Sequence, residues 1–233
     1  MADDFNTLDV IAGTVSGTLG VTGAATMSST LDVTGTLTAF GYLGVGGNAG
    51  IAASLDVAGS CSGIWGPRDN TLIAATYDPA VATSTQLLTG GTIYLAKMFI
   101  PRTATPTKLY WNVTTAATTA TADQCWVSVL SSAGAVLATP VDVTTASEST
   151  GLKTTTVAPG SLTANTYVWG AIVLAGSTVA TLSRTAASSG PLNAGAATAD
   201  MRFAINGTAQ TTITTRTPAS NTVGPSLWMA LGA

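Results

Sequence analysis

Leucine and valine return at a fixed interval in the first quarter of the chain. The phrase Leu-x-Val-x-Gly begins at Leu19, Leu31, Leu43 and Leu55, a spacing of twelve residues each time, and a looser copy begins at Leu8. Within each phrase apolar and polar positions alternate, which is the period of a half-buried strand. The closing glycine is typical of a turn. A repeat of twelve does not match the helical periods of about 3.6 and 3.5 residues, so the pattern predicts short strands and turns.

A single twelve-residue unit cannot bury its own leucine and valine. Each fully buried side chain contributes about 1.5–3 kcal/mol, whereas ordering one residue costs about 1–2 kcal/mol in backbone entropy. The units can be stabilised by stacking within one chain or by winding three chains around a shared axis. Because the units are few and have no capping helix, we favour an intertwined trimeric β-shaft. Its core layers are Leu19, Val21, Leu31, Val33, Leu43, Val45, Leu55 and Val57.

The pattern changes near residue 65 to longer runs rich in β-branched and aromatic residues, bounded by turn signals such as Pro159-Gly160 and Asn206-Gly207. Such runs are typical of strands, and their number suggests a jelly-roll-like β-sandwich. The chain is therefore expected to be all-β. Its three parts are an attachment segment (1–18), the repetitive shaft (19–64) and a globular β-sandwich domain (65–233). The nine predicted strands are 71–77, 92–100, 107–113, 124–130, 151–157, 166–174, 177–183, 201–205 and 226–231.

Composition limits the partners that the chain can have. Charged residues make up only 8% of it, and the net charge is −3 with eight basic residues, so nothing indicates a nucleic-acid partner. Although the mean hydropathy is +0.41, the longest apolar run, from Tyr167, has ten residues, and a membrane-spanning helix needs about twenty. The N-terminal MADDFN lacks the features of a signal peptide. We expect neither membrane insertion nor secretion.

No arrangement of residues indicates catalysis. The chain has no histidine, which excludes Ser-His-Asp systems and His-containing zinc sites. Cys61 and Cys125 form no metal-type spacing and are expected to be buried as small hydrophobes, with a disulfide between them left open. We expect no enzymatic activity, metal or cofactor. The carboxylates that a glycoside hydrolase would need show no suggestive spacing; they are Asp69, Asp78, Asp123, Asp142, Glu148 and Asp200.

Binding is the remaining chemistry, and aromatic residues are its candidates. Tyr110 and Trp111 are adjacent on a predicted strand, so their rings face opposite sides and one is expected to be exposed or at a subunit interface. An exposed ring beside an amide is suited to stacking on a sugar. We predict Trp111 and Asn112 as glycan-binding residues. The competing interpretation is that strand aromatics belong to the core.

Two groups of phrases resemble known virion proteins. The repeats GTLGVTGAATMSSTLDVTGTLT resemble the shaft repeats of trimeric fibre proteins of tailed bacteriophages. The phrases STGLKTTTVAPGSLTANTYVWGAIVLAG, MRFAINGTAQTTI and TPASNTVGPSLWMAL resemble C-terminal β-sandwich domains of minor tail and head-fibre proteins of phages infecting actinobacteria. The resemblance implies a homotrimer on the virion surface, made in the host cytoplasm, with its N-terminus attached to the major capsid protein or a tail protein.

The chain departs from long tail fibres in one respect. Only a short segment precedes the first regular repeat, and we expect it to act as a peptide anchor through Phe5, Leu8, Val10 and Ile11. This favours a head fibre or capsid decoration protein with outward-facing domains, for which adhesion to host-surface glycans is secondary. The alternative is a tail fibre or minor tail receptor-binding protein that recognises cell-wall glycan.

Overall fold

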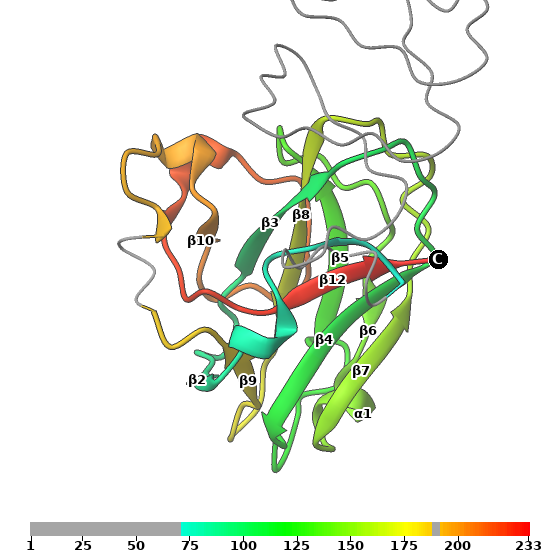
Figure 1. The fold of residues 1–233 in the computed structure, drawn as a ribbon. Coiled ribbons are helices and arrows are strands. Elements are labelled where there is room, and N and C mark those ends of the chain that lie inside the picture. The colour runs from blue at the N-terminus through cyan, green and yellow to red at the C-terminus, as the bar shows by residue number, and fades with distance from the viewer. Residues whose placement is uncertain (1–70, 188–191) are drawn as a thin grey trace, which may run out of the picture. The chain divides into compact units, whose positions relative to one another are not determined.

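A computed structural model describes residues 71–187 and 192–233 of the chain. The predicted attachment segment, the shaft and the boundary near residue 65 lie outside these residues. Within them the chain is all-β and forms two six-stranded antiparallel sheets (Figure 1). This confirms the all-β prediction for that part of the chain, and each of the nine predicted segments overlaps a strand.

The first sheet is centred on β4. One edge of β4 pairs with β7, while its other edge pairs with β12 along its first half and with β9 along its second half. β1 extends the sheet beyond β12, and β2 extends it beyond β9. The six strands are β1 (Leu72–Ala75), β2 (Ser84–Leu87), β4 (Lys108–Thr115), β7 (Gly151–Thr156), β9 (Thr181–Arg184) and β12 (Met229–Gly232).

The second sheet has the order β11-β10-β3-β8-β5-β6. Its central pair is β3 with β8, which stays in register from Tyr94 opposite Ile172 to Ile100 opposite Thr166. The chain changes sheet at every step from β2 to β5 and from β6 to β10, so most neighbouring strands are distant in sequence; β5–β6 and β10–β11 are the consecutive pairs. The strands are β3 (Tyr94–Ile100), β5 (Trp126–Ser131), β6 (Val141–Asp142), β8 (Thr166–Val173), β10 (Phe203–Ile205) and β11 (Thr222–Val223).

Helical turns are short. They include η2 (Pro79–Val81), α1 (Thr144–Ser147), η3 (Thr198–Asp200) and η4 (Pro218–Ser220). In the part of the chain that the structure describes, no helix has the length and apolar character to cross a membrane.

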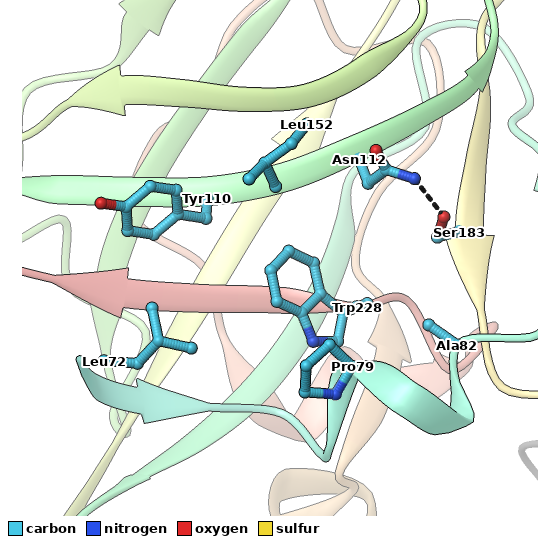
Figure 2. A pocket seen from close by; sticks show the side chains of 8 residues that line it. All are labelled: Leu72, Pro79, Ala82, Tyr110, Asn112, Leu152, Ser183 and Trp228. Carbon is cyan, nitrogen blue, oxygen red and sulfur yellow. Dashed lines mark hydrogen bonds between the residues drawn. The ribbon is translucent and has the colours of Figure 1, made fainter. Parts of the chain in front are cut away.

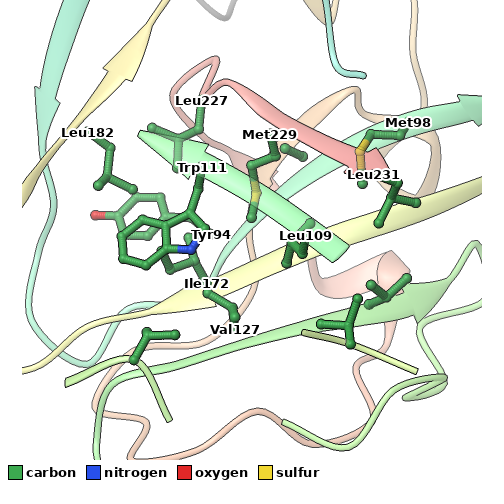
Figure 3. Close-up of a cluster of buried hydrophobic side chains, with 14 of the residues drawn as sticks. Tyr94, Met98, Leu109, Trp111, Val127, Ile172, Leu182, Leu227, Met229 and Leu231 are labelled. Carbon is green, nitrogen blue, oxygen red and sulfur yellow. The ribbon is translucent and has the colours of Figure 1, made fainter. Parts of the chain in front are cut away.

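The main core lies between the two sheets. Alternation along β4 turns Leu109, Trp111 and Val113 inward, each at most 1% exposed. They meet inward side chains of the second sheet, so that both sheets contribute to one apolar layer (Figure 3). The labelled members of this layer are Tyr94, Met98, Leu109, Trp111, Val127, Ile172, Leu182, Leu227, Met229 and Leu231. The two sheets therefore pack as a β-sandwich.

A second, smaller apolar cluster covers the outer face of the second sheet. Leu95, Trp169 and Ala171 belong to it, and Ile213, from the connection between β10 and β11, packs over them. This face of the sheet is thus covered by the chain itself over part of its length. The cover explains why the predicted strand YVWGAIVL is apolar throughout and does not alternate.

Candidate functional site

The outer face of the first sheet carries a pocket of about 450 Å³ (Figure 2). Strands β4, β7 and β9 form its floor and one wall. Leu72 of β1, the turn η2 and Trp228 before β12 close the opposite side. Segments from both ends of the described chain therefore meet in it. The lining side chains are Leu72, Pro79, Ala82, Tyr110, Asn112, Leu152, Ser183 and Trp228.

Strand alternation places the floor residues. Since Leu109, Trp111 and Val113 point into the core, Tyr110 and Asn112 point to the outside of the sheet. Asn112 is paired with Leu152 of β7, which is 60% exposed and stands on the same face. The pocket thus joins an aromatic ring, an amide and an exposed aliphatic side chain on one surface.

Tyr110 lies against the backbone of Gly232. A Cβ added to Gly232 would be 2.6 Å from Cε2 of Tyr110, closer than side-chain contacts allow. Because Gly232 has no side chain, the phenol ring of Tyr110 fits beside β12. Any larger residue would move the ring and change the shape of the pocket.

Asn112 and Ser183 supply the polar groups of the floor. Asn112 Nδ2 donates a hydrogen bond of 2.6 Å to Ser183 Oγ. Figure 2 shows that Oδ1 of Asn112 points away from Ser183. Because the amide nitrogen is held by Ser183, this oxygen is oriented as an acceptor for a hydroxyl group of a ligand.

Trp228 forms the wall opposite Tyr110. Its side chain is 8% exposed, and within the described residues its Nε1 finds no hydrogen-bond partner. A buried indole N–H without an acceptor costs about 1–3 kcal/mol, so it calls for an explanation. The pocket is lined by aromatic and aliphatic groups with a few convergent polar atoms, which is the usual composition of a small-molecule site.

No charged side chain lines this pocket among the residues that the structure describes. An anionic or cationic ligand would find no partner in it. A neutral ring that has both apolar C–H faces and hydroxyl groups fits better. Its C–H faces can stack on the rings of Tyr110 and Trp228, and a hydroxyl group can donate to Asn112 Oδ1. This is the chemistry of an uncharged saccharide.

Trp111 is not part of this site, and its prediction as an exposed stacking residue is wrong. The indole is 0% exposed, and its Nε1 donates to Thr155 Oγ1 at 3.2 Å inside the core. Asn112 does line the pocket, and Tyr110 is the aromatic neighbour beside it. The sequence held the relevant signal: Trp111 shares its strand face with Leu109 and Val113, whereas Tyr110 shares its face with polar residues.

The described carboxylates serve local structure. Asp78 Oδ1 accepts from Ala80 N at 2.8 Å, and Asp142 Oδ1 accepts from Thr144 N at 2.7 Å. Glu148 Oε1 accepts from Ala120 N, and Asp200 Oδ1 accepts from Lys97 Nζ. Asp123 lies in a turn with a positive φ of 58°. Asp69 lies outside the described residues, as does Cys61, while Cys125 is buried. Within the described ranges no three His, Cys, Asp or Glu residues are placed to share a metal ion.

Comparison with known protein families and with curated proteins finds no match for the chain.

Proposed function

We propose that this chain is a structural protein of a tailed-phage virion: a homotrimeric head fibre or capsid decoration protein anchored through its N-terminus. Its jelly-roll-like β-sandwich domains face outward from the particle and adhere to host-surface glycan. The observation that carries the adhesive role is the uncharged pocket formed by Tyr110, Asn112 and Trp228. The protein acts by binding alone, with no enzymatic step and no cofactor.

The trimeric part of the proposal is supported by the repeats. Leu-x-Val phrases at a spacing of twelve residues supply regularly spaced apolar layers, which three chains can bury together. Three domains on one fibre also change the strength of adhesion. A shallow pocket with one or two hydrogen bonds binds a sugar weakly, but linked pockets raise the overall avidity by about 10²–10⁴-fold without any new contact.

Saccharide binding is tested by titrating the full chain with neutral cell-wall oligosaccharides and following the heat of binding. Tyr110→Ala should reduce the affinity at least tenfold, because it removes the ring from the floor of the pocket. The matched control is Leu87→Ala, which removes another exposed apolar side chain, 59% exposed and outside the pocket. Unchanged affinity in Tyr110→Ala, or no binding by the parent protein, would reject the adhesive role.

The oligomeric state is tested by sedimentation equilibrium of the full chain. A trimer is expected, and Leu31→Asp together with Leu43→Asp should dissociate it by placing charge in the apolar layers. Asp32→Asn changes the polar position between Leu31 and Val33 of the same segment, which alternation places away from the apolar layers, so this variant should remain trimeric. A monomeric parent protein would reject the fibre proposal.

A tail receptor-binding protein is the second candidate, and the same glycan-type pocket favours it. Its position on the particle separates the two. Immunogold electron microscopy of purified virions, with antibody against residues 65–233, should label the head if the protein is a decoration fibre. Labelling confined to the tail tip would replace our proposal with the receptor-binding role.

A further inference from the structure

A second pocket lies beside the outer face of β3 and β8, and Ala75 and Thr76 at the end of β1 line its other side. It has a volume of about 450 Å³. Unlike the pocket on the first sheet, it combines aromatic with charged side chains. Its lining residues are Ala75, Thr76, Lys97, Phe99, Tyr167, Asp200 and Arg202.

The aromatic side of this pocket is a pair of exposed rings. Phe99 and Tyr167 stand directly opposite each other in the β3–β8 ladder. Their ring centroids are 5.2 Å apart with the planes tilted by 52°, and the residues are 42% and 48% exposed. Farther along the same face Ile213 covers the sheet, whereas these two rings remain open to solvent. They offer a rigid apolar surface for stacking.

Lys97 is held beside these rings. Its side chain is only 12% exposed, and Nζ lies 5.3 Å from the ring centroid of Tyr167 and 5.1 Å from that of Trp169. Its partner Asp200 is 73% exposed, and the Nζ–Oδ1 distance is 3.4 Å. An ion pair with so exposed a carboxylate contributes little. An anion from solution can therefore replace Asp200 at the ammonium group.

Arg202 adds a second cation next to Lys97, since Lys97 N donates to Arg202 O at 2.8 Å between neighbouring segments. The Arg202 guanidinium donates through Nη2 to the carbonyl oxygen of Thr76 and lies 5.5 Å from the ring of Phe203. In the described part of the chain, its Nε and Nη1 make no hydrogen bond. Each of these two nitrogens can donate to an oxygen of a carboxylate or phosphate.

We propose that this pocket is a second binding site, specific for an anionic saccharide: a sugar ring that carries a carboxylate or a phosphate. The ring stacks on Tyr167 and Phe99, while the anionic group is bound by Arg202 and Lys97 in place of Asp200. The first pocket has no charged lining and selects uncharged sugars. The two pockets thus bind different sugars, and this site does not depend on the first.

The test uses the full chain and two anionic probes, a galacturonate oligosaccharide and glucose 1-phosphate, with the methyl-esterified oligosaccharide as the uncharged counterpart. At least one anionic probe should bind, and the stronger one identifies the anion. Arg202→Gln and Tyr167→Ala should each weaken it at least tenfold, and binding should weaken as salt rises. The control Lys108→Gln removes an exposed cation of the first sheet and should have no effect.

Asp200→Asn is predicted to raise the affinity for the anionic probe, because it removes the carboxylate that competes for Lys97. This variant should bind the anionic probe several times more tightly, a gain that loss of folding cannot produce. Equal binding of the methyl ester, unchanged affinity in Arg202→Gln, or loss of binding in Asp200→Asn would overturn the proposal. So would dissociation of the oligomer by Arg202→Gln, which would make the pocket a subunit contact. Tyr110→Ala should leave anion binding intact, so failure of the first pocket is distinguishable from failure of this one.

Discussion

The indole N–H of Trp111 donates a hydrogen bond of 3.2 Å to the hydroxyl of Thr155, inside the core and across the pair β4–β7. Both residues are buried, Trp111 with an exposed fraction of 0% and Thr155 with 7%. The bond gives each of the two polar groups a hydrogen-bond partner. The same two strands present Tyr110 and Leu152 on their outer side. The hydrogen bond therefore stabilises the strand pair that forms the floor of the pocket.

Trp111→Phe should destabilise the domain by about 1–3 kcal/mol, since it leaves the buried hydroxyl of Thr155 without a partner. Urea unfolding followed by circular dichroism measures this change. The double variant with Thr155→Val should lose less than the sum of the two single variants, because both polar groups are then absent. Strict additivity would show that the two groups do not interact.

Gly134 is predicted to be intolerant of any side chain. Its φ is +87°, and an added Cβ would lie 2.0 Å from the carbonyl oxygen of Arg216. Gly134→Ala should therefore displace the connection between β10 and β11 that covers the second sheet, at a cost of several kcal/mol. Unfolding midpoints and amide hydrogen exchange around Ile213 report both effects.

Gly160→Ala is the matched control for this prediction. Gly160 also has a positive φ, +77°, but an added Cβ would meet nothing within 4 Å. This variant should lose only about 1 kcal/mol of stability, because alanine is strained at a positive φ. Equal losses in the two variants would mean that the contact with Arg216 has no energetic role.

The strands were predictable because each carries a local signal. In β4, apolar and polar residues alternate, and the predicted turn sites at Gly160 and Gly207 both have positive φ. The strands that were not predicted lack such a signal. β2 is the polar segment STQL, while β6 and β11 have two residues each and exist only through their pairing partners.

The pockets were harder to predict, because their residues come from distant parts of the sequence. Leu72 and Trp228 meet only because β1 pairs with β12, and local periodicity holds no information about that pairing. The exposure of Phe99 and Tyr167 also has a nonlocal cause. Apart from Lys97 and the terminal Thr166, both strands are apolar on both faces. The path of the β10–β11 connection separates their covered part from their open part.

Asn193 is predicted to position Arg202. Its Oδ1 accepts hydrogen bonds from Arg202 N at 2.7 Å and Phe203 N at 3.1 Å, and its Nδ2 donates to Phe203 O at 2.8 Å. Asn193→Ala should cost about 1–3 kcal/mol, since it removes the acceptor of the N–H groups of Arg202 and Phe203. Faster amide exchange at Phe203 and weaker binding of the anionic probe should accompany the loss. Full stability in this variant would contradict the positioning role.

Tyr77 provides a test of pH dependence. Burial raises the pKa of its phenol, despite the opposing effects of a backbone hydrogen bond and of Arg184 and Arg202. Its hydroxyl donates to the carbonyl oxygen of Ser226 at 2.8 Å. A group whose pKa is higher in the folded state stabilises the fold fully below its unfolded pKa of about 10, and this contribution is lost as the pH rises above that value.

Tyr77→Phe should therefore be less stable than the parent protein at pH 7, by about 0.5–1.5 kcal/mol for the lost hydrogen bond. Above about pH 10 the stability of the parent should fall more steeply, because ionisation of Tyr77 is then coupled to unfolding. Urea unfolding of both proteins between pH 8 and 11, roughly the range that spans tyrosine ionisation, measures the difference between them. Ionisations common to both proteins cancel in that difference. A gap that stays constant or widens with pH would show that the phenol is as easily ionised in the folded protein as in the unfolded chain.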